Sequence, residues 1–157
     1  MIKLVRIDHR LLHGQVAFAW TPALGIDAIM IVNDAAANND EQRSIIRMAK
    51  PQGTKLAIKT VDEAVATLKS GKTADMNLFV IVGSVDDAVK LHAGYPAIDH
   101  INLGGMKARE GTRSLSKAVN LLPAEEQEIK DLIADGVTVE LRQVPGDTAV
   151  PAQKLIK

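Results

Sequence analysis

The chain is organised around the stretch Arg6-Ile7-Asp8-His9-Arg10-Leu11-Leu12-His13-Gly14-Gln15. An apolar run, Ile2–Val5, precedes it, and Val16–Leu24 follows with apolar residues at helical spacing as far as Gly25. The stretch is therefore predicted to be a strand-to-helix turn that concentrates basic, acidic and histidine side chains. In open α/β proteins ligands bind where strands feed helices, and a helix N-terminus offers free N–H groups to an anion. The turn predicts a phosphate-handling site.

Composition excludes several classes of protein. The 157 residues are 46% hydrophobic, and no apolar run is long enough to span a bilayer, which takes about 18 residues. Aromatic residues make up only 3% and the formal net charge is zero, so no nucleic-acid partner is expected. The absence of cysteine excludes disulfides, thiol catalysis and cysteine-ligated zinc. We expect a cytoplasmic protein with a single domain over residues 1–157.

Apolar strands alternate with helical segments, which favours a parallel sheet covered on both faces. Lys55–Lys59 alternates in polarity, as edge strands do. The fold class predicted is α/β: a single-domain, doubly wound, mostly parallel sheet with helices on both faces. Its strands are expected at Ile2–Ile7, Ala28–Asn33, Lys55–Lys59, Asn77–Val82, Ile98–Leu103 and Val137–Val144.

The connecting segments carry helix signals. Helical structure is expected within Ala35–Lys50, with Asn39 as a candidate cap and Ile45, Met48 and Ala49 facing the core. The others are expected at Gly14–Leu24, from the Thr60–Glu63 capping box to Ser70, after Ser84, and from Pro123 towards Gly136. The stretch Lys107–Asn120 is expected to be looser, and the tail after Pro145 to add a short helix.

Two interpretations are open for His13: it caps or packs the start of the helix, or it accepts a phosphoryl group. Gly14 favours the second, because a residue without Cβ lets a bulky anion approach the backbone. The planar fork of Arg10 matches phosphate oxygens, and Asp8 is placed to hold one ring nitrogen of His13. His9 competes for the role but lacks a following glycine and ranks below His13.

Further site candidates lie in the same turn and after other strands. Arg6 either reaches the site or forms a surface ion pair, and Gln15 either donates a hydrogen bond at the site or is solvated. If the sheet is parallel, Asp34, Ser84 and the Gly104-Gly105 turn open on the same edge as His13, although Ser84 also fits a simple helix cap with Asp87. One basic run is either a solvated face or a docking surface for an acidic partner; its members are Lys107, Arg109, Arg113 and Lys117.

Sequence motifs typical of other reaction classes are absent from the chain. The chain has no phosphate-binding P-loop, no dinucleotide-binding glycine pattern, no His-Glu-x-x-His and no nucleophile elbow, so neither a metal nor a cofactor is expected. One rival is a receiver-like regulatory module phosphorylated on aspartate, with Asp8, Ser84 and Lys107 in corresponding places. Such a module needs an acidic pair after its first strand and an aspartate after its third, where this chain has only Asp8 and Thr60.

The stretch Arg6–Val16 resembles the active-site loop of the IIB components of the bacterial sugar phosphotransferase system, mannose/sorbose class, which reads Arg-(Ile/Val)-Asp-x-Arg-(Leu/Ile)-(Leu/Ile)-His-Gly-Gln-Val. The resemblance extends along nearly the whole chain. It includes Trp20, Val32-Asn33-Asp34, Asn102-Leu103-Gly104-Gly105-Met106 and Gly136-Val137-x-Val139.

The resemblance implies a phosphohistidine cycle. His13 would accept phosphate from a IIA protein, here expected as a separate chain, and pass it to a sugar carried by the membrane IIC and IID components, with which this chain would associate peripherally. Arg10 would stabilise the phosphoryl group and Asp8 would orient the loop, while the resemblance favours Nδ1 as the phosphorylated atom. Neither the sugar nor the oligomeric state follows from the sequence, and a homo-oligomer is compatible with it. The remaining site-lining residues would be Arg6, Gly14, Gln15, Asp34, Ser84 and Gly105.

Overall fold

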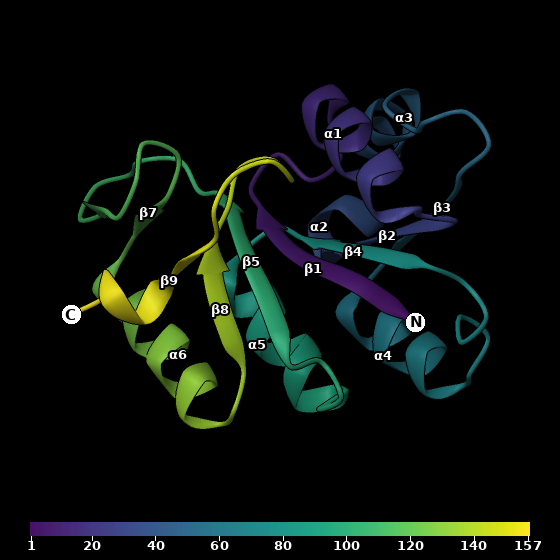
Figure 1. Cartoon of the computed structure of the whole chain (residues 1–157). Helices are drawn as coiled ribbons and strands as arrows, with labels where there is room; N and C mark the ends of the chain where they lie inside the picture. Colours follow the sequence, from purple (N-terminus) through teal and green to yellow (C-terminus); the bar gives the residue numbers. More distant parts are fainter.

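The centre of the fold is a seven-stranded sheet of order β3-β2-β4-β1-β5-β8-β9, seen in a computed structural model that describes residues 1–157 (Figure 1). All neighbouring strands are parallel except β9, which runs antiparallel to β8. The predicted fold class is confirmed, including the edge position of Lys55–Lys59. The strands are β1 (Ile2–Asp8), β2 (Ala28–Val32), β3 (Lys55–Lys59), β4 (Leu78–Val82), β5 (His100–Gly105), β8 (Thr138–Leu141) and β9 (Val150–Pro151).

Helices cover both faces of the sheet (Figure 1). On one face, α1 (Gly14–Leu24), α2 (Asp34–Ala37) and α3 (Asp40–Met48) pack over β1, β2 and β4. On the other face lie α4 (Val61–Lys69), α5 (Val85–Gly94) and α6 (Pro123–Ala134). A short 3-10 helix, Ala152–Lys154, follows β9, as expected for the tail. None of these helices combines the length and the apolar character that crossing a lipid bilayer requires.

The helical segment expected over Ala35–Lys50 is confirmed in part, including its Asn39 cap. The segment forms two helices: α2 ends at its C-cap Asn38, and Asn39 caps α3, as predicted, by accepting a hydrogen bond from the N–H of Gln42 at 2.9 Å. Ile46 packs into the core, whereas Ile45 and Met48, which were expected there, are 60% and 86% exposed.

Local capping signals were reliable. The predicted Thr60–Glu63 capping box and the Ser84 cap on the Asp87 N–H are both present. Strand boundaries were less so: the fifth strand is shifted to His100–Gly105, and the last predicted strand is only Thr138–Leu141. The looser stretch Lys107–Asn120 contains β6 (Arg113–Ser114), which pairs antiparallel with β7 (Asn120–Leu121).

Candidate active site

Alternation along β1 aims its charged residues at one face. Val5 and Ile7 pack into the core beneath α4, α5 and α6, so Arg6 and Asp8 lie on the opposite face, towards α1. Both are buried, with 2% and 3% of their surface exposed. The loop after β1 is then anchored by Leu11 and Leu12, whose side chains are buried in the core under α1. Apolar side chains thus anchor the turn, and the polar groups of the turn face a cavity.

The backbone of this loop is strained at one position. Leu11 has φ 58°, a left-handed conformation that β-carbon sterics disfavour, and it is the only non-glycine residue with positive φ. Its N–H donates to the carbonyl of Asp8 at 2.9 Å, closing a tight turn. Strain of this kind costs on the order of 1–3 kcal/mol and persists where the surrounding packing imposes it.

His13 occupies the N-cap position of α1, with φ −147° and ψ 167°. Its Nε2 lies 3.2 Å from Oδ2 of Asp8, and the other oxygen of that carboxylate accepts the backbone N–H of Arg10 at 3.0 Å. An ionised carboxylate only accepts hydrogen bonds, so Nε2 of His13 carries the proton and Nδ1 the lone pair. Nδ1 is buried and has no hydrogen-bond partner in the protein.

The charge state of Asp8 is set by opposing effects. Burial by itself raises the pKa of its carboxyl, but the hydrogen bonds from His13 and from the Arg10 N–H, with the positive charge of Arg6, outweigh it and hold the pKa below its ordinary value. Arg6 lies 3.4 Å from the same oxygen that binds His13. Asp8 therefore stays an acceptor for the imidazole.

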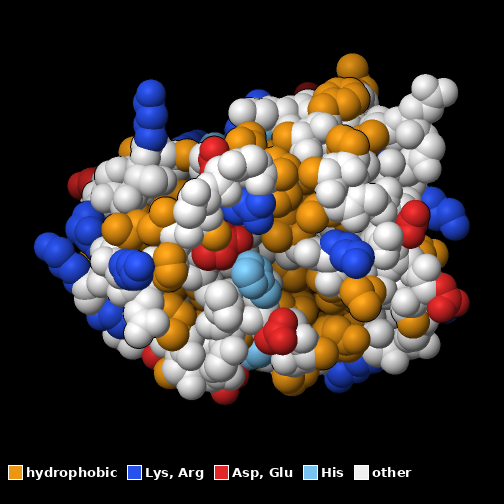
Figure 2. Space-filling view, viewed as in Figure 1, with side chains coloured by type: hydrophobic (Ala, Val, Ile, Leu, Met, Phe, Trp, Pro, Cys, Tyr) orange, Lys and Arg blue, Asp and Glu red, His pale blue; other side chains and the backbone are white.

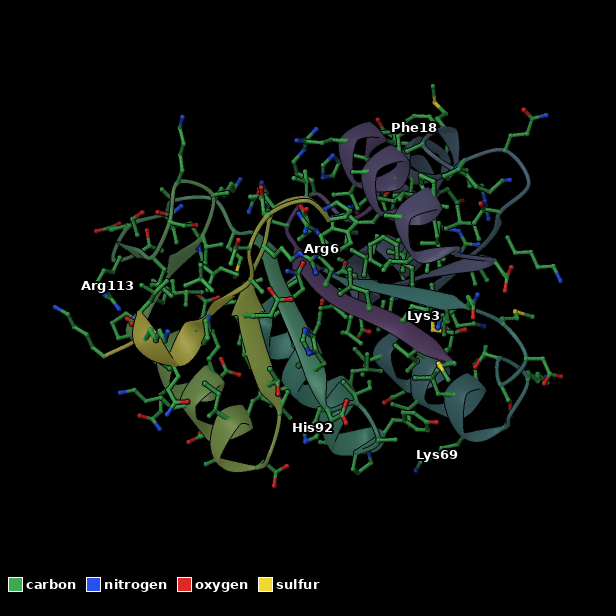
Figure 3. The ribbon with its side chains drawn as sticks, viewed as in Figure 1. Lys3, Arg6, Phe18, Lys69, His92 and Arg113 are labelled. Atoms are coloured by element: carbon green, nitrogen blue, oxygen red, sulfur yellow. The ribbon has the colours of Figure 1, made fainter.

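A cavity of about 400 Å³ opens beside His13. From the predicted site it collects Arg6, Asp8, Arg10, His13, Gln15 and Gly105, together with the lower-ranked His9. Figure 3 shows Arg6 among the carboxyl ends of β1 and β5 and the segment that follows β8. Sequence reasoning did not name two of its polar lining residues, Asn120 and Gln143. Gln143 follows β8, and nothing near it in the sequence marks it as a site residue.

Two glycines at the end of β5 make room for these charges. A Cβ on Gly104 would clash with the guanidinium of Arg6, and one on Gly105 would come within 3.1 Å of the Asp8 carboxylate. Gly14 differs, because a Cβ there would meet nothing within 4 Å. The space in front of Gly14 is thus open to an approaching group.

Comparisons with known proteins identify the family of the chain. The family model for the PTS system sorbose subfamily IIB component matches residues 2–157. The chain belongs to this family. It is 34% identical over 149 residues to a sorbose-specific EIIB component of Klebsiella pneumoniae, covering 95% of this chain and 91% of that protein. The crystal structure of the IIBSor domain of the sorbose permease from the same organism superposes with TM-score 0.92 at 33% identity, covering 98% of this chain and 94% of that one.

A further relative of the family is larger. The chain is 29% identical over 156 residues to a mannose-specific EIIAB component of Escherichia coli, covering 99% of this chain but 48% of that protein. The IIB fold here therefore corresponds to about half of that relative.

Three predicted site residues of this IIB component do not line the His13 cavity: Gly14, Asp34 and Ser84. Asp34, at the start of α2, accepts the N–H of Val61 at 2.8 Å and so ties α2 to α4. Ser84 caps α5 and lines a smaller neighbouring cavity of about 120 Å³ that also contacts His9 and Lys107. Strand order explains the difference, because β4 neighbours β1 whereas β2 lies beyond β4.

The basic run of the IIB component divides into two pairs. Arg109 binds Glu125, and Arg113 binds Glu126 and the carbonyl of Leu155, so both arginines tie the β6–β7 region to α6 or the tail. The lysines of the run, Lys107 and Lys117, line the His13 cavity instead. The cavity thus carries more positive charge than the turn motif alone predicts. No cluster of three or more histidine, aspartate or glutamate side chains with metal-binding geometry is present.

Proposed function

We propose that this chain is the phosphoryl carrier of a sugar phosphotransferase system: His13 accepts phosphate from a phosphohistidine of a IIA protein and passes it to a sugar held by membrane IIC and IID components. One observation carries the proposal. Asp8 holds Nε2 of His13, and this leaves Nδ1 as the free nucleophile at the N-terminus of α1 in a basic cavity. In this role the chain works at the cytoplasmic face of the membrane, beside the permease.

The first transfer exchanges one N–P bond for another. The lone pair of Nδ1 attacks phosphorus, the N–P bond of the donor histidine breaks, and the donor nitrogen keeps the electron pair. The ring of His13 then carries positive charge on Nε2–H, which Asp8 stabilises. The phosphoryl oxygens need donors and positive charge, which Arg10, Lys107, Lys117 and the free N–H groups of the first turn of α1 supply.

The covered position of Nδ1 adds a requirement. Because the atom is buried when His13 lies on Asp8, the ring or its loop must shift before phosphorus can reach it. The strained Leu11 lies two residues before His13 and is a natural place for such a shift.

The second transfer moves the phosphoryl group to oxygen. A sugar hydroxyl attacks phosphorus and loses its proton to water, the Nδ1–P bond breaks, and neutral His13 returns to Asp8. Relatives named for sorbose and for mannose support a sugar as the acceptor.

The chemistry of the bound phosphate tests the proposal. Phosphorylation by a purified upstream relay should produce a label on His13 that is lost in acid and stable in base, because protonation makes the ring nitrogen a better leaving group. The label should pass to a sugar when membranes with the permease are added. A base-labile label on Asp8 or Asp34 without onward transfer would instead indicate the receiver-like alternative.

A further inference from the structure

A buried polar row crosses the sheet beneath the proposed site. We define the row as Arg6 on β1, Asn102 on β5 and Glu140 on β8, which are direct neighbours in the strand register. Their exposed fractions are 2%, 0% and 4%. On the same face of the sheet, β2 and β4 present only apolar side chains to α1 and α3: Ile29, Ile31, Phe79 and Ile81. Figure 2 shows basic, acidic and histidine side chains side by side over β5 and β8.

The hydrogen bonds of the row all run the same way: Arg6 donates to Asn102, and Asn102 donates to Glu140. The Glu140 carboxylate accepts from Nδ2 of Asn102 at 3.2 and 3.3 Å, and Oδ1 of Asn102 accepts from Arg6 at 2.9 Å. Since a carboxylate only accepts and a guanidinium only donates, the Asn102 amide has one orientation that satisfies both. Arg6 then contacts the Asp8 oxygen that binds His13.

The charges along this path alternate. Glu140 is negative, Arg6 positive and Asp8 negative, and all three are buried. A buried charge interacts more strongly with its neighbours than an exposed one, because little water screens it. Without Glu140, the Arg6 charge would be balanced by Asp8 alone, and Asp8 would become a weaker acceptor for the imidazole of His13.

We propose that Glu140 and Asn102 are positioning residues for His13: they neutralise and orient Arg6, so that Asp8 keeps its full strength towards Nε2–H and Nδ1 remains the free nitrogen. For its effect on transfer, this inference rests on the proposed function. The phosphorylated ring carries positive charge, so the negative end of the row also stabilises the product of the first transfer. Glu140 lies on β8, more than 120 residues after His13 in the sequence. It thereby influences which ring nitrogen of His13 carries the proton.

The experiment begins with Glu140→Gln in the full chain, which keeps the shape and removes the charge. Nitrogen-15 NMR of the unphosphorylated protein, at a pH where His13 is neutral, reports the fraction of the ring with its proton on Nε2. We expect this fraction to fall, and the rate of His13 phosphorylation to fall roughly tenfold, the lower end of the effect seen for hydrogen-bond partners of metal-binding histidines. Glu126→Gln is the matched control, because Glu126 is also buried and bound to an arginine, Arg113, but lies away from the cavity.

A second variant separates charge from folding. The double substitution N102D/E140Q returns one negative charge to the row, next to Arg6, with an amide still available at position 140. We expect it to recover much of the Nε2–H fraction and of the rate. An unchanged His13 tautomer in folded Glu140→Gln, or no recovery in the folded double variant, would overturn the inference. If the tautomer responds but the wild-type protein takes no phosphate on His13, the proposed function fails and the positioning role stands.

Discussion

Three histidines in this structure contact a carboxylate, namely His13, His92 and His100, and a comparison of His13 with His92 shows how such contacts differ. His13 contacts the buried Asp8 and leaves Nδ1 without a partner. His92, near the end of α5, uses both ring nitrogens: Nδ1 lies 2.8 Å from the carbonyl of Ile98, and Nε2 lies 2.8 Å from Asp135. The side chain of Asp135 is 72% exposed, against 4% for Asp8. His13 therefore differs from His92 in having both a buried carboxylate partner and a ring nitrogen without a partner.

The cavities around the two histidines differ in charge. The cavity between α5 and α6 beside His92 is the larger, at about 480 Å³ against 400 Å³, but three carboxylates line it: Glu128, Asp131 and Asp135. Burial, together with neighbouring acids, raises the pKa of Glu128. Such a surface repels a phosphoryl group, whereas the lysines and arginines around His13 attract one. Charge, and not size, distinguishes the site.

The largest expected effect comes from the two histidines themselves. His13→Ala should abolish phosphorylation and leave cooperative unfolding intact, because His13 makes no capping hydrogen bond to α1. His92→Ala should keep phosphorylation and lower the free energy of unfolding by about 1–3 kcal/mol, since it removes the buried hydrogen bond to the Ile98 carbonyl and the partly buried one to Asp135. Labelling and urea denaturation measure both. Loss of label in His92→Ala with His13→Ala still labelled would reverse the assignment.

The two carboxylates should differ almost as strongly. Asp8→Asn places an amide that can donate to Nε2, so the proton of the ring moves to Nδ1; transfer should fall on the order of 10⁴-fold, as in the histidine–aspartate pair of serine proteases. It also leaves Arg6 buried beside a neutral group, at a cost of about 3–5 kcal/mol in stability. Asp135→Asn, at an exposed pair, should change stability by no more than about 1 kcal/mol and transfer not at all. Similar transfer rates in the two variants would contradict this distinction.

Arg10 should contribute through the shape of its side chain. Arg10→Lys keeps the charge and loses the planar fork, so transfer should slow by about tenfold, less than the loss of an entire transition-state donor. Arg113→Lys is the control: Arg113 binds Glu126 and the carbonyl of Leu155, so its loss should lower stability and leave transfer unchanged. Single-turnover transfer and thermal unfolding separate the two outcomes, and equal slowing in both variants would refute the assignment.

The lysines at the His13 cavity should affect the rate at which the chain associates with the phosphoryl donor. Replacing Lys107 and Lys117 by alanine should slow association with the phosphoryl donor a few-fold at low salt and flatten its salt dependence. Exposed charges are screened beyond about 10 Å at 0.1 M salt, so the effect should shrink as salt rises. Arg109→Ala is the control, because Glu125 already binds that arginine. If the association rate of the wild-type protein does not change with salt concentration, the contact with the donor is apolar instead.

The smallest effect concerns pH and stability. The hydrogen bond to Glu140 raises the pKa of His100 above its ordinary value of about 6.5, against the opposing effect of burial. A raised pKa adds stability that is fully present below the ordinary value and is lost as pH rises through the raised one. Denaturation at several pH values should therefore show a small loss of stability above about pH 6.5, which His100→Gln removes. A steeper loss in His100→Gln would show that other groups dominate this range.

The sequence predicted most of the turn around His13, because its signals are local. Neighbouring residues carry the strand, the tight turn, the glycine and the helix start, so one short stretch sufficed to locate the cavity. The same reasoning failed for the buried face of α3, where Ile46 packs into the core and Ile45 and Met48 are exposed. It also grouped Asp34 with the cavity, although β2 and β1 are separated by β4, a distance of about 9–10 Å at the usual strand spacing.

By itself, the sequence determined the alternation of strands and helices, the helix caps and the residue types gathered in the Arg6–Gln15 turn. Only the tertiary structure decided that Glu140 and Asn102 lie beside Arg6, that two lysines reach the cavity, and that Asp8 binds Nε2 rather than Nδ1. The physical reason is sequence separation: local signals depend on backbone preferences within a few residues. The polar row depends instead on strand order, which brings β1, β5 and β8 together from opposite ends of the chain.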